Sequence, residues 1–291
     1  MTVQNAYLQQ VTTLSTVYEQ REAATIAGWV MENVTGMRRV DRLIHKDRLL
    51  TAAELDQLNS YTQRLLQHEP VQYVLNEAWF AGMKFYVDNN VLIPRPETEE
   101  LVEWILQYVA ATHGPETRVS IIDIGTGSGC IPVSLKNELP FSTVYAVDVS
   151  EGALTVARKN ADSLNTAIVF LQQDILEVDL WQNIPEADII VSNPPYIKES
   201  EAEQMHKNVL QHEPHLALFV PNEDALIFYR KIADMALQRL KPQGALFFEI
   251  NEALGREVCE MLTQKGFTKV ELRKDLQQKD RMVTALLPLR N

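Results

Sequence analysis

The feature that most restricts the possible folds of this chain is an alternation of apolar runs and helical patterns that begins at Val119. Four short apolar runs lie at 119–124, 143–149, 167–172 and 187–193. Continuous apolar runs of this length are typical of strands that are buried on both faces, and their alternation with helices is typical of a parallel sheet. We therefore expect an α/β domain whose sheet is covered by helices on both sides.

The rest of the carboxyl-terminal half continues this pattern and ends in two strands without a helix between them. Helical spacing from Ile227 is followed by an expected strand at 245–250 and an expected helix at 254–262. Only a link rich in Lys and Asp separates the last two expected strands, 268–272 and 282–287, which favours a terminal hairpin. These elements predict a mostly parallel seven-stranded sheet with a carboxyl-terminal hairpin.

A polar, irregular stretch from Lys198 to Asp224 interrupts the alternation. It is longer than an ordinary connection between two elements of a compact domain. Two explanations fit this length: a lid over a ligand site, or a disordered loop.

The first 68 residues carry a different pattern, with apolar residues three and four positions apart and almost no strand signal, as at Leu8, Val11 and Leu14. Thr51 is followed three residues later by Glu54, which fits a capping box and predicts that a helix begins there. We expect a small helical bundle, which serves either as a docking surface or as a packing module without a function of its own.

The segment between these two parts has the pattern of a hairpin. Residues 79–93 place aromatic and β-branched side chains around Asp88-Asn89-Asn90, which predicts two strands joined by that turn. The prolines and early acidic residues of 94–100 predict that a helix begins directly afterwards. The expected parts are a helical domain at 1–75, a hairpin connector at 76–95 and an α/β domain at 96–291.

Charge and composition exclude several classes of partner. The chain has 27 Lys and Arg against 39 Asp and Glu, a net charge of -12 that repels phosphate backbones, so nucleic-acid binding is not expected. It has two cysteines, no charged-then-apolar leader and no membrane-spanning apolar run, which indicates the cytoplasm and no membrane partner. The six histidines lack the spacing of a metal site, so no metal is expected.

A glycine-rich turn directly follows the first strand of the sheet and opens the next helix. It consists of Gly125, Thr126, Gly127, Ser128 and Gly129. Glycines allow positive φ and let a ligand approach the backbone closely, as nucleotide-binding turns require. The spacing is not that of a dinucleotide turn, and Asp123 precedes it, where a carboxylate suits a cation better than a pyrophosphate. Both details favour S-adenosylmethionine, which carries a sulfonium and an ammonium.

Two more acidic residues follow neighbouring strands. Asp148 ends the second strand, where its two carboxylate oxygens can accept hydrogen bonds from both ribose hydroxyls of a nucleoside. Asp174 follows the third strand and can accept from the adenine amino group, with Ile175 beside the ring. The alternative for Asp174 is that it caps a turn.

The tetrapeptide Asn193-Pro194-Pro195-Tyr196 ends the fourth strand, at the edge where open α/β sheets bind ligands. Its two prolines remove two N–H donors, which leaves an acceptor-rich pocket for an NH₂ group. The Asn193 side-chain oxygen and the Pro194 carbonyl can each accept one of its hydrogens, while Tyr196 stacks on the planar group. We expect methyl transfer to a planar amide or amine nitrogen, with Asn193 also bordering the methyl donor and Pro195 contacting the acceptor.

The tetrapeptide alone does not choose between acceptors. The exocyclic amine of adenine in DNA or RNA fits it as well as an amide does. The acidic chain lacks the basic stripe that such nucleic-acid enzymes use. A non-catalytic binding module with the same fold is the other alternative, and the presence of Asp148 and the tetrapeptide argues against it.

Several motifs spread along the chain agree with one known family. They are Glu69-Pro70-Val71-Gln72-Tyr73, the segment Val91 to Glu99, the glycine turn through Cys130, the segment Val191 to Ile197, and Glu213-Pro214 with Ala217-Leu218. On these residues the chain resembles the release factor glutamine methyltransferase family, also called the HemK or PrmC family, over nearly its whole length. It departs from the family pattern at Asn76 and Asn251, where relatives commonly have glycine.

The resemblance implies a Rossmann-like class I methyltransferase that uses S-adenosylmethionine. The implied acceptor is the side-chain amide nitrogen (N5) of the glutamine in the Gly-Gly-Gln motif of bacterial class-1 peptide chain release factors. The helical domain would then help to dock the release factor. Arg95 and Glu97 would position the lid or the peptide, or would hold the joint between the domains.

Overall fold

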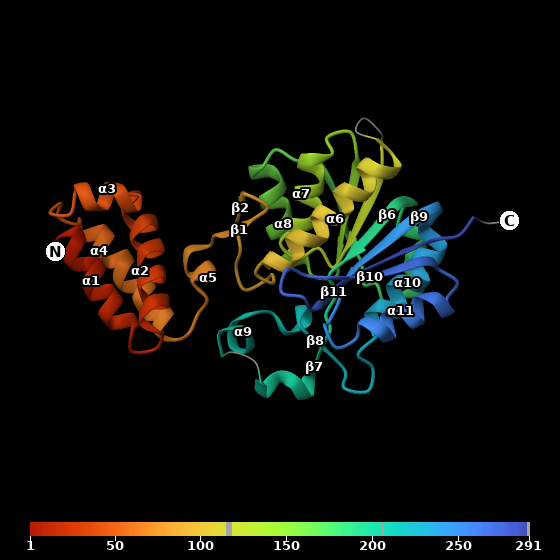
Figure 1. Cartoon of the computed structure of the whole chain (residues 1–291). Helices are drawn as coiled ribbons and strands as arrows, with labels where there is room; N and C mark the ends of the chain where they lie inside the picture. The colour runs from red at the N-terminus through yellow and green to blue at the C-terminus, as the bar shows by residue number, and fades with distance from the viewer. Residues whose placement is uncertain (115–117, 205–206, 290–291) are drawn as a thin grey trace. The chain divides into compact units, whose positions relative to one another are not determined.

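The computed structural model describes residues 1–114, 118–204 and 207–289 and divides them into two compact units (Figure 1). The smaller unit contains residues 1–77 together with α9 (Lys207–His212). The larger unit contains the remaining described residues, and the hairpin that follows residue 77 belongs to it. Each unit has a hydrophobic core of its own.

The smaller unit is the expected helical bundle. Its helices are α1 (Val3–Leu14), α2 (Gln20–Thr35), α3 (Arg39–Ile44), α4 (Ala52–Leu66) and α5 (Val71–Leu75). The predicted capping box is confirmed: Thr51 Oγ1 accepts from the Glu54 backbone N–H at 3.2 Å, and Glu54 Oε2 accepts from the Thr51 N–H at 2.7 Å. Asn76 follows α5 with a φ of 53°. Asparagine tolerates this left-handed conformation, which explains how it can replace glycine there.

The larger unit contains the predicted seven-stranded sheet. Its strands are β3 (Ser120–Ile124), β4 (Thr143–Asp148), β5 (Ile168–Gln172), β6 (Ala187–Ser192), β9 (Leu240–Glu249), β10 (Thr268–Lys274) and β11 (Asp280–Leu286). Their order across the sheet is β10-β11-β9-β6-β3-β4-β5. The five strands from β9 to β5 are parallel, and β11 and β10 form the antiparallel terminal hairpin.

Helices cover both faces of this sheet (Figure 1). One face carries α6 (Pro96–Thr112), α7 (Cys130–Glu138) and α8 (Glu151–Ser163), and the other carries α10 (Ile227–Arg239) and α11 (Gly255–Gln264). Successive strand residues point to opposite faces, so Ile121 packs with α6 and α7 while Ile122 packs with α10 and α11. Burial on both faces explains why the strands read as unbroken apolar runs.

The chain reverses its direction across the sheet between β3 and β6. From β3 it continues to β4 and β5, and after the short helix η1 (Val178–Asn183) it returns to form β6 on the other side of β3. The Ser192 hydroxyl donates to the Ile124 carbonyl at 2.7 Å and joins the carboxyl ends of these two strands. Such a switch point leaves a crevice at the carboxyl edge of the sheet, where ligands bind in open α/β folds.

The hairpin has a different turn from the one predicted. Its strands are β1 (Ala78–Phe80) and β2 (Met83–Phe85), joined by Ala81 and Gly82, which have φ values of 48° and 73°. The prediction that Asp88-Asn89-Asn90 forms this turn was wrong. A two-residue turn with positive φ at both positions matches the twist of short paired strands, whereas the Asp88 carboxylate accepts from the Asn90 N–H at 3.0 Å in a separate local turn.

The stretch expected to be irregular contains several short elements. They are β7 (Ile197–Lys198), η2 (Glu199–Gln204), α9, η3 (His215–Ala217) and β8 (Phe219–Val220), and residues 205 and 206 lie outside the described part. Parallel pairing of β7 with β8 holds the two ends of the stretch together, and burial of Leu218 and Val220 anchors the second end. Its action as a lid stays a prediction. Over the described residues, no helix has the length and apolar character needed to cross a membrane.

Candidate active site

A cavity of about 230 Å³ lies in the larger unit at the carboxyl ends of the parallel strands. One water needs roughly 10–15 Å³ measured in this way, so the space suits an organic molecule of more than a dozen non-hydrogen atoms. The predicted residues that line it are Gly125, Thr126, Gly127, Ser128, Asp148, Asp174, Ile175, Asn193, Pro194 and Pro195. The predicted residues Asp123, Gly129 and Tyr196 are not among its lining.

The glycines of the turn serve two different purposes. Gly125 and Gly127 have φ values of 74° and 53°, and a Cβ at either position would meet no atom of the described residues within 4 Å. Both therefore allow a strained turn and leave the backbone open toward the cavity. A Cβ on Gly129 would lie 3.1 Å from Ala157 Cβ, so this glycine permits the close packing of the turn against α8.

Asp148 holds the turn and also presents acceptors to the cavity. Its Oδ2 accepts from the Gly127 N–H and its Oδ1 from the Ser150 N–H, both at 2.9 Å. Burial raises the pKa of this carboxyl, while the backbone hydrogen bonds act in the opposite direction. Because each carboxylate oxygen accepts more than one hydrogen bond, Asp148 can also bind two ligand hydroxyls.

Asp123 lies fully buried at the end of β3. Neither of its carboxylate oxygens has a hydrogen-bond partner of normal geometry among the described residues. Burial raises the pKa of Asp123 to about 7, against a smaller lowering by the neighbouring Thr126 hydroxyl. A buried carboxyl of this kind is neutral in mildly acidic solution and becomes ionised more readily when a cation approaches.

The segment directly after β5 contributes four consecutive residues to the cavity, from Gln173 to Leu176. The half-buried Asp174 accepts through Oδ1 from the Leu176 N–H at 2.8 Å, so it does cap a turn while it lines the cavity, and Ile175 is buried beside it. Gln173 was not anticipated. Its Nε2 is buried without a partner among the described residues, and its backbone N–H donates to the Asp148 carbonyl at 2.9 Å. The signal in the sequence was its position directly after a parallel strand.

The tetrapeptide that ends β6 divides between the cavity and the core. Asn193, Pro194 and Pro195 line the cavity, and Asn193 Nδ2 donates to Thr98 Oγ1 at 3.3 Å. The Tyr196 ring instead packs against the core on the side of α10 and α11, and burial raises the pKa of its hydroxyl. Stacking of Tyr196 on a substrate therefore stays a prediction.

Comparison with known proteins identifies the family. Residues 105–217 match the methyltransferase small domain, and residues 8–75 match the PrmC N-terminal domain. The release factor glutamine methyltransferase of Flavobacterium psychrophilum is 43% identical over 284 residues, which cover 97% of this chain and 98% of that protein. That of Bacteroides thetaiotaomicron is 42% identical over 96% of this chain and 98% of its own length. This chain belongs to the release factor glutamine methyltransferase family.

A solved structure shares the fold of this family member. The structure described as hMettl16 catalytic domain in complex with MAT2A 3'UTR hairpin 6 aligns with a TM-score of 0.55 and 18% identity over 82% of each chain. At this identity the similarity concerns the fold alone. It agrees with the mostly parallel α/β architecture predicted from the order of strands and helices, and with the Rossmann-like methyltransferase fold that the family resemblance implies.

Arg95 and Glu97, the two motif residues of the family whose roles were left open, lie in different surroundings. Arg95 lines the cavity and forms an ion pair with Glu213, at 2.6 Å between Arg95 Nη2 and Glu213 Oε1. The Glu213 side chain is 1% exposed and also accepts from the Ile93 N–H at 3.3 Å. This ion pair anchors Glu213, at the start of the segment that leads to β8, to Arg95. Glu97 does not line the cavity and accepts from Gln277 Nε2 at 3.4 Å.

Two further buried polar residues lie beside the tetrapeptide in this family member. Thr98 and Glu249 are 3% and 2% exposed, and the Thr98 hydroxyl donates to Glu249 Oε2 at 2.6 Å. Neither residue was predicted from the sequence to belong to the site. The available signal was weak: Glu249 is a carboxylate directly after the apolar run 245–248, where an ionisable group is unusual.

Proposed function

We propose that this protein transfers a methyl group from S-adenosylmethionine to the side-chain amide nitrogen of the glutamine in the Gly-Gly-Gln motif of class-1 peptide chain release factors. The observation that carries this proposal is one cavity that joins a nucleoside-type turn to the acceptor edge formed by Asn193 and Pro194. Membership of the release factor glutamine methyltransferase family favours a glutamine over an adenine as the acceptor. Because release factors act on cytoplasmic ribosomes, we infer that the protein works in the cytoplasm.

The residues at the turn fit the methyl donor. The open backbone at Gly125 and Gly127 would lie against it, and Asp148 would accept from the ribose hydroxyls. Asp174 and Ile175 would border the adenine. When bound, the donor supplies an electrophilic methyl group on a sulfonium.

The tetrapeptide would orient the acceptor nitrogen. Asn193 Oδ1 and the Pro194 carbonyl each accept one hydrogen of the glutamine amide, which turns the nitrogen toward the methyl group. The two prolines add no competing N–H donors. An amide nitrogen is a weak nucleophile, and these acceptors stabilise the positive charge that develops on it, so alignment replaces a strong base.

We propose that the helical unit of residues 1–77 contributes to docking of the release factor. The match of residues 8–75 to the PrmC N-terminal domain supports this role. The acidic chain, with its net charge of -12, favours a protein partner over nucleic acid. We assign the substrate contacts to Asn193 and Pro194, with Pro195 beside them and Tyr196 as the predicted stacking partner.

The substrate is tested by transfer of labelled methyl groups from S-adenosylmethionine to a purified class-1 release factor. We expect one methyl group for each release factor, located by mass spectrometry on the glutamine of its Gly-Gly-Gln motif. Changing that glutamine to alanine should abolish labelling, since no other side chain would present an amide to the pocket. Labelling that survives this change, or labelling of adenine in DNA or RNA, would contradict the proposed substrate.

Binding of the donor should release a proton in mildly acidic solution. Asp123, with its pKa raised to about 7, is mostly protonated in the free protein below that pH, and a nearby cation favours the ionised form. We expect more proton release at about pH 6 than at about pH 8.5, because Asp123 is already ionised at the higher pH. Calorimetry in buffers with different ionisation enthalpies measures this release. Asp123→Asn should eliminate it, and undiminished release from this variant would show that another group titrates.

A further inference from the structure

Three side chains from separate elements meet beside the acceptor end of the cavity. Thr98 lies in the first turn of α6, Glu249 ends β9, and Asn193 follows β6. Thr98 Oγ1 lies 2.6 Å from Glu249 Oε2 and 3.3 Å from Asn193 Nδ2. The hydroxyl of Thr98 therefore connects a buried carboxylate to the amide that faces the substrate.

The hydrogen count of this group determines the direction of every bond in it. An ionised carboxylate only accepts hydrogen bonds, and a hydroxyl has one hydrogen, so the Thr98 hydrogen goes to Glu249. Thr98 Oγ1 can then only accept, and the NH₂ of Asn193 is the group that donates to it. The opposite end of the Asn193 amide, Oδ1, is thereby directed away from Thr98.

This direction matters because an asparagine amide has a donor end and an acceptor end of nearly the same shape. A half-turn of the Asn193 amide would exchange Oδ1 with the NH₂ group. The NH₂ would then face the N–H of a substrate amide, donor against donor, and the acceptor needed by the reaction would be lost. A hydrogen bond that selects one orientation of the Asn193 amide lowers the population of this unproductive state.

Glu249 takes the ionised form that this order requires above about pH 7. Burial raises its pKa to about 7, against the lowering effects of the hydrogen bond from Thr98 and of the positive charges of Arg281 and Arg95. The Arg281 side chain is 14% exposed and donates from Nε to Asp275 Oδ2 at 3.1 Å. This ion pair restrains the side chain of Arg281, which belongs to β11 of the terminal hairpin.

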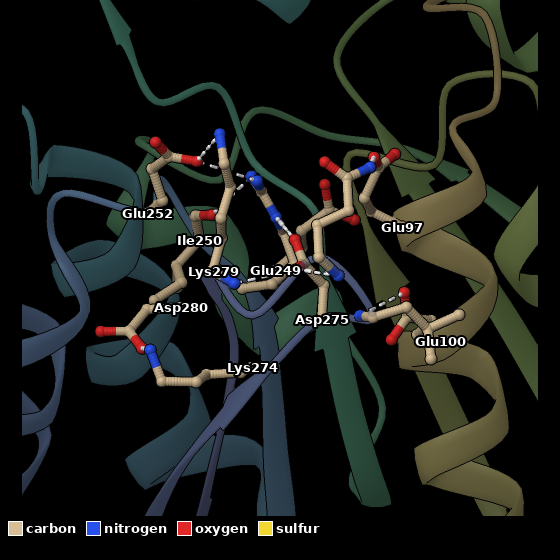
Figure 2. A network of polar contacts seen from close by, with 12 residues as sticks. Glu97, Glu100, Glu249, Ile250, Glu252, Lys274, Asp275, Lys279 and Asp280 are labelled. Atoms are coloured by element: carbon tan, nitrogen blue, oxygen red, sulfur yellow. Dashed lines mark hydrogen bonds and ion pairs between the residues drawn. The ribbon is translucent and has the colours of Figure 1, made fainter.

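The terminal hairpin also holds the turn of α6 that carries Thr98. Figure 2 shows Glu97 and Glu100 on the side of α6 that faces the turn containing Asp275. The Leu276 backbone N–H donates to Glu100 Oε1 at 3.2 Å, and Gln277 Nε2 donates to Glu97 Oε1 at 3.4 Å. Glu97 and Glu100 flank Thr98 along the helix, so these contacts restrain the position of the Thr98 hydroxyl.

We infer that Thr98 and Glu249 are positioning residues, which together hold the Asn193 amide with Oδ1 toward the substrate nitrogen. The inference rests on the proposed function, because it extends the role assigned there to Asn193. Neither residue needs to touch the glutamine for this effect.

The first test compares Thr98→Val, which keeps the shape but removes the hydroxyl, with Thr98→Ser, which keeps the hydroxyl. Loss of one hydrogen bond that selects the amide orientation should lower kcat about tenfold in Thr98→Val, with the dissociation constant for S-adenosylmethionine unchanged. Thr98→Ser should retain kcat within about twofold. Thr112→Val is the matched control, because it removes an exposed hydroxyl from the same helix. Wild-type kcat in Thr98→Val would overturn the inference.

The Glu249→Gln variant distinguishes a role in orienting the Asn193 amide from a purely structural role. The glutamine can accept from the Thr98 hydroxyl through Oε1, as the carboxylate does, or donate to Thr98 Oγ1, after which the Thr98 hydroxyl donates to Asn193 Oδ1. Every hydrogen bond is kept, but its direction is no longer fixed, so the Asn193 amide divides between its two orientations. A structural role predicts unchanged kcat for this variant. At about pH 8.5, where Glu249 of the wild type is ionised, we expect kcat to fall at least about twofold with an unchanged melting temperature, and this variant carries the test if Thr98→Val does not fold. Unchanged kcat would overturn the inference.

A measurement without substrate distinguishes failure of this inference from failure of the proposed function. The side-chain ¹⁵N–¹H signals of Asn193, assigned by their loss in Asn193→Ala, report the hydrogen bond to Thr98. Hydrogen exchange at this amide should be about tenfold faster in Thr98→Val and unchanged in Thr98→Ser. If the wild-type protein fails to label release factors while these signals respond as stated, the proposed function is wrong and the positioning stands. Equal exchange in both variants would overturn the positioning itself.

Discussion

Asn193→Ala should lower kcat for release-factor methylation by roughly two to three powers of ten while the dissociation constant for S-adenosylmethionine changes less than about threefold. The Asn193 side chain lies at the cavity beside Pro194, and its oxygen is the acceptor that we assign to the substrate N–H. Stabilisation of the charge that develops on nitrogen is largest in the transition state, so its loss appears in kcat. Single-turnover methyl transfer and calorimetric titration of the donor measure the two quantities separately.

Asn137→Ala provides the matched control for this experiment. Asn137 lies on α7, and its Nδ2 donates to the exposed Glu138 beside it. The same change of side chain should leave kcat within about twofold of the wild-type value, as surface substitutions usually do. If Asn193→Ala instead reduced donor affinity and left kcat unchanged, Asn193 would belong to the donor site and its assigned role would be wrong.

The second large effect is expected at Asp148, which should be needed for donor binding. Asp148→Ala removes the acceptors assigned to two ribose hydroxyls and the partner of the Gly127 N–H in the turn. Each hydrogen bond to a charged group contributes about 1.5–3 kcal/mol, so we expect at least a hundredfold weaker binding of S-adenosylmethionine. Calorimetry or equilibrium dialysis measures this change, and near-saturating donor should restore part of the activity.

Two variants make the Asp148 experiment specific. Asp148→Asn keeps one acceptor oxygen and should bind the donor with intermediate affinity. Asp162→Ala removes an exposed carboxylate from the following helix, α8, and should bind as the wild type does. Donor binding within tenfold of wild type in Asp148→Ala would show that the ribose is held by other groups.

The strands and the donor end of the site were predictable because their signals are local. Each parallel strand is a short run of apolar residues, since both of its faces are buried. Gly125 and Gly127 need positive φ and open space, which glycine provides. Asp148 ends a parallel strand, so its place at the carboxyl edge followed from the order of the elements.

Other features depended on competition between local patterns and packing. The hairpin turns at Ala81-Gly82 although Asp88 to Asn90 has the stronger turn composition, because strand pairing selected the shorter turn. Tyr196 belongs to a motif that suggests stacking on a substrate, and the structure packs its partly buried ring against the core on the side of α10 and α11, so stacking stays a prediction. Residue types alone do not tell which face of a loop becomes buried.

The sequence by itself determined the α/β sheet, the helical unit, the nucleoside-type turn and the family to which the chain belongs. Only the tertiary structure decided that Thr98 and Glu249 meet, 151 residues apart, and that Thr98 lies beside Asn193, 95 residues further along the chain. Periodicity records which face of an element is buried, whereas the partner and direction of a hydrogen bond depend on how three elements pack together. For this reason the sequence predicted the residue to which we assign the acceptor, and the structure revealed the side chains to which we assign the positioning of that residue.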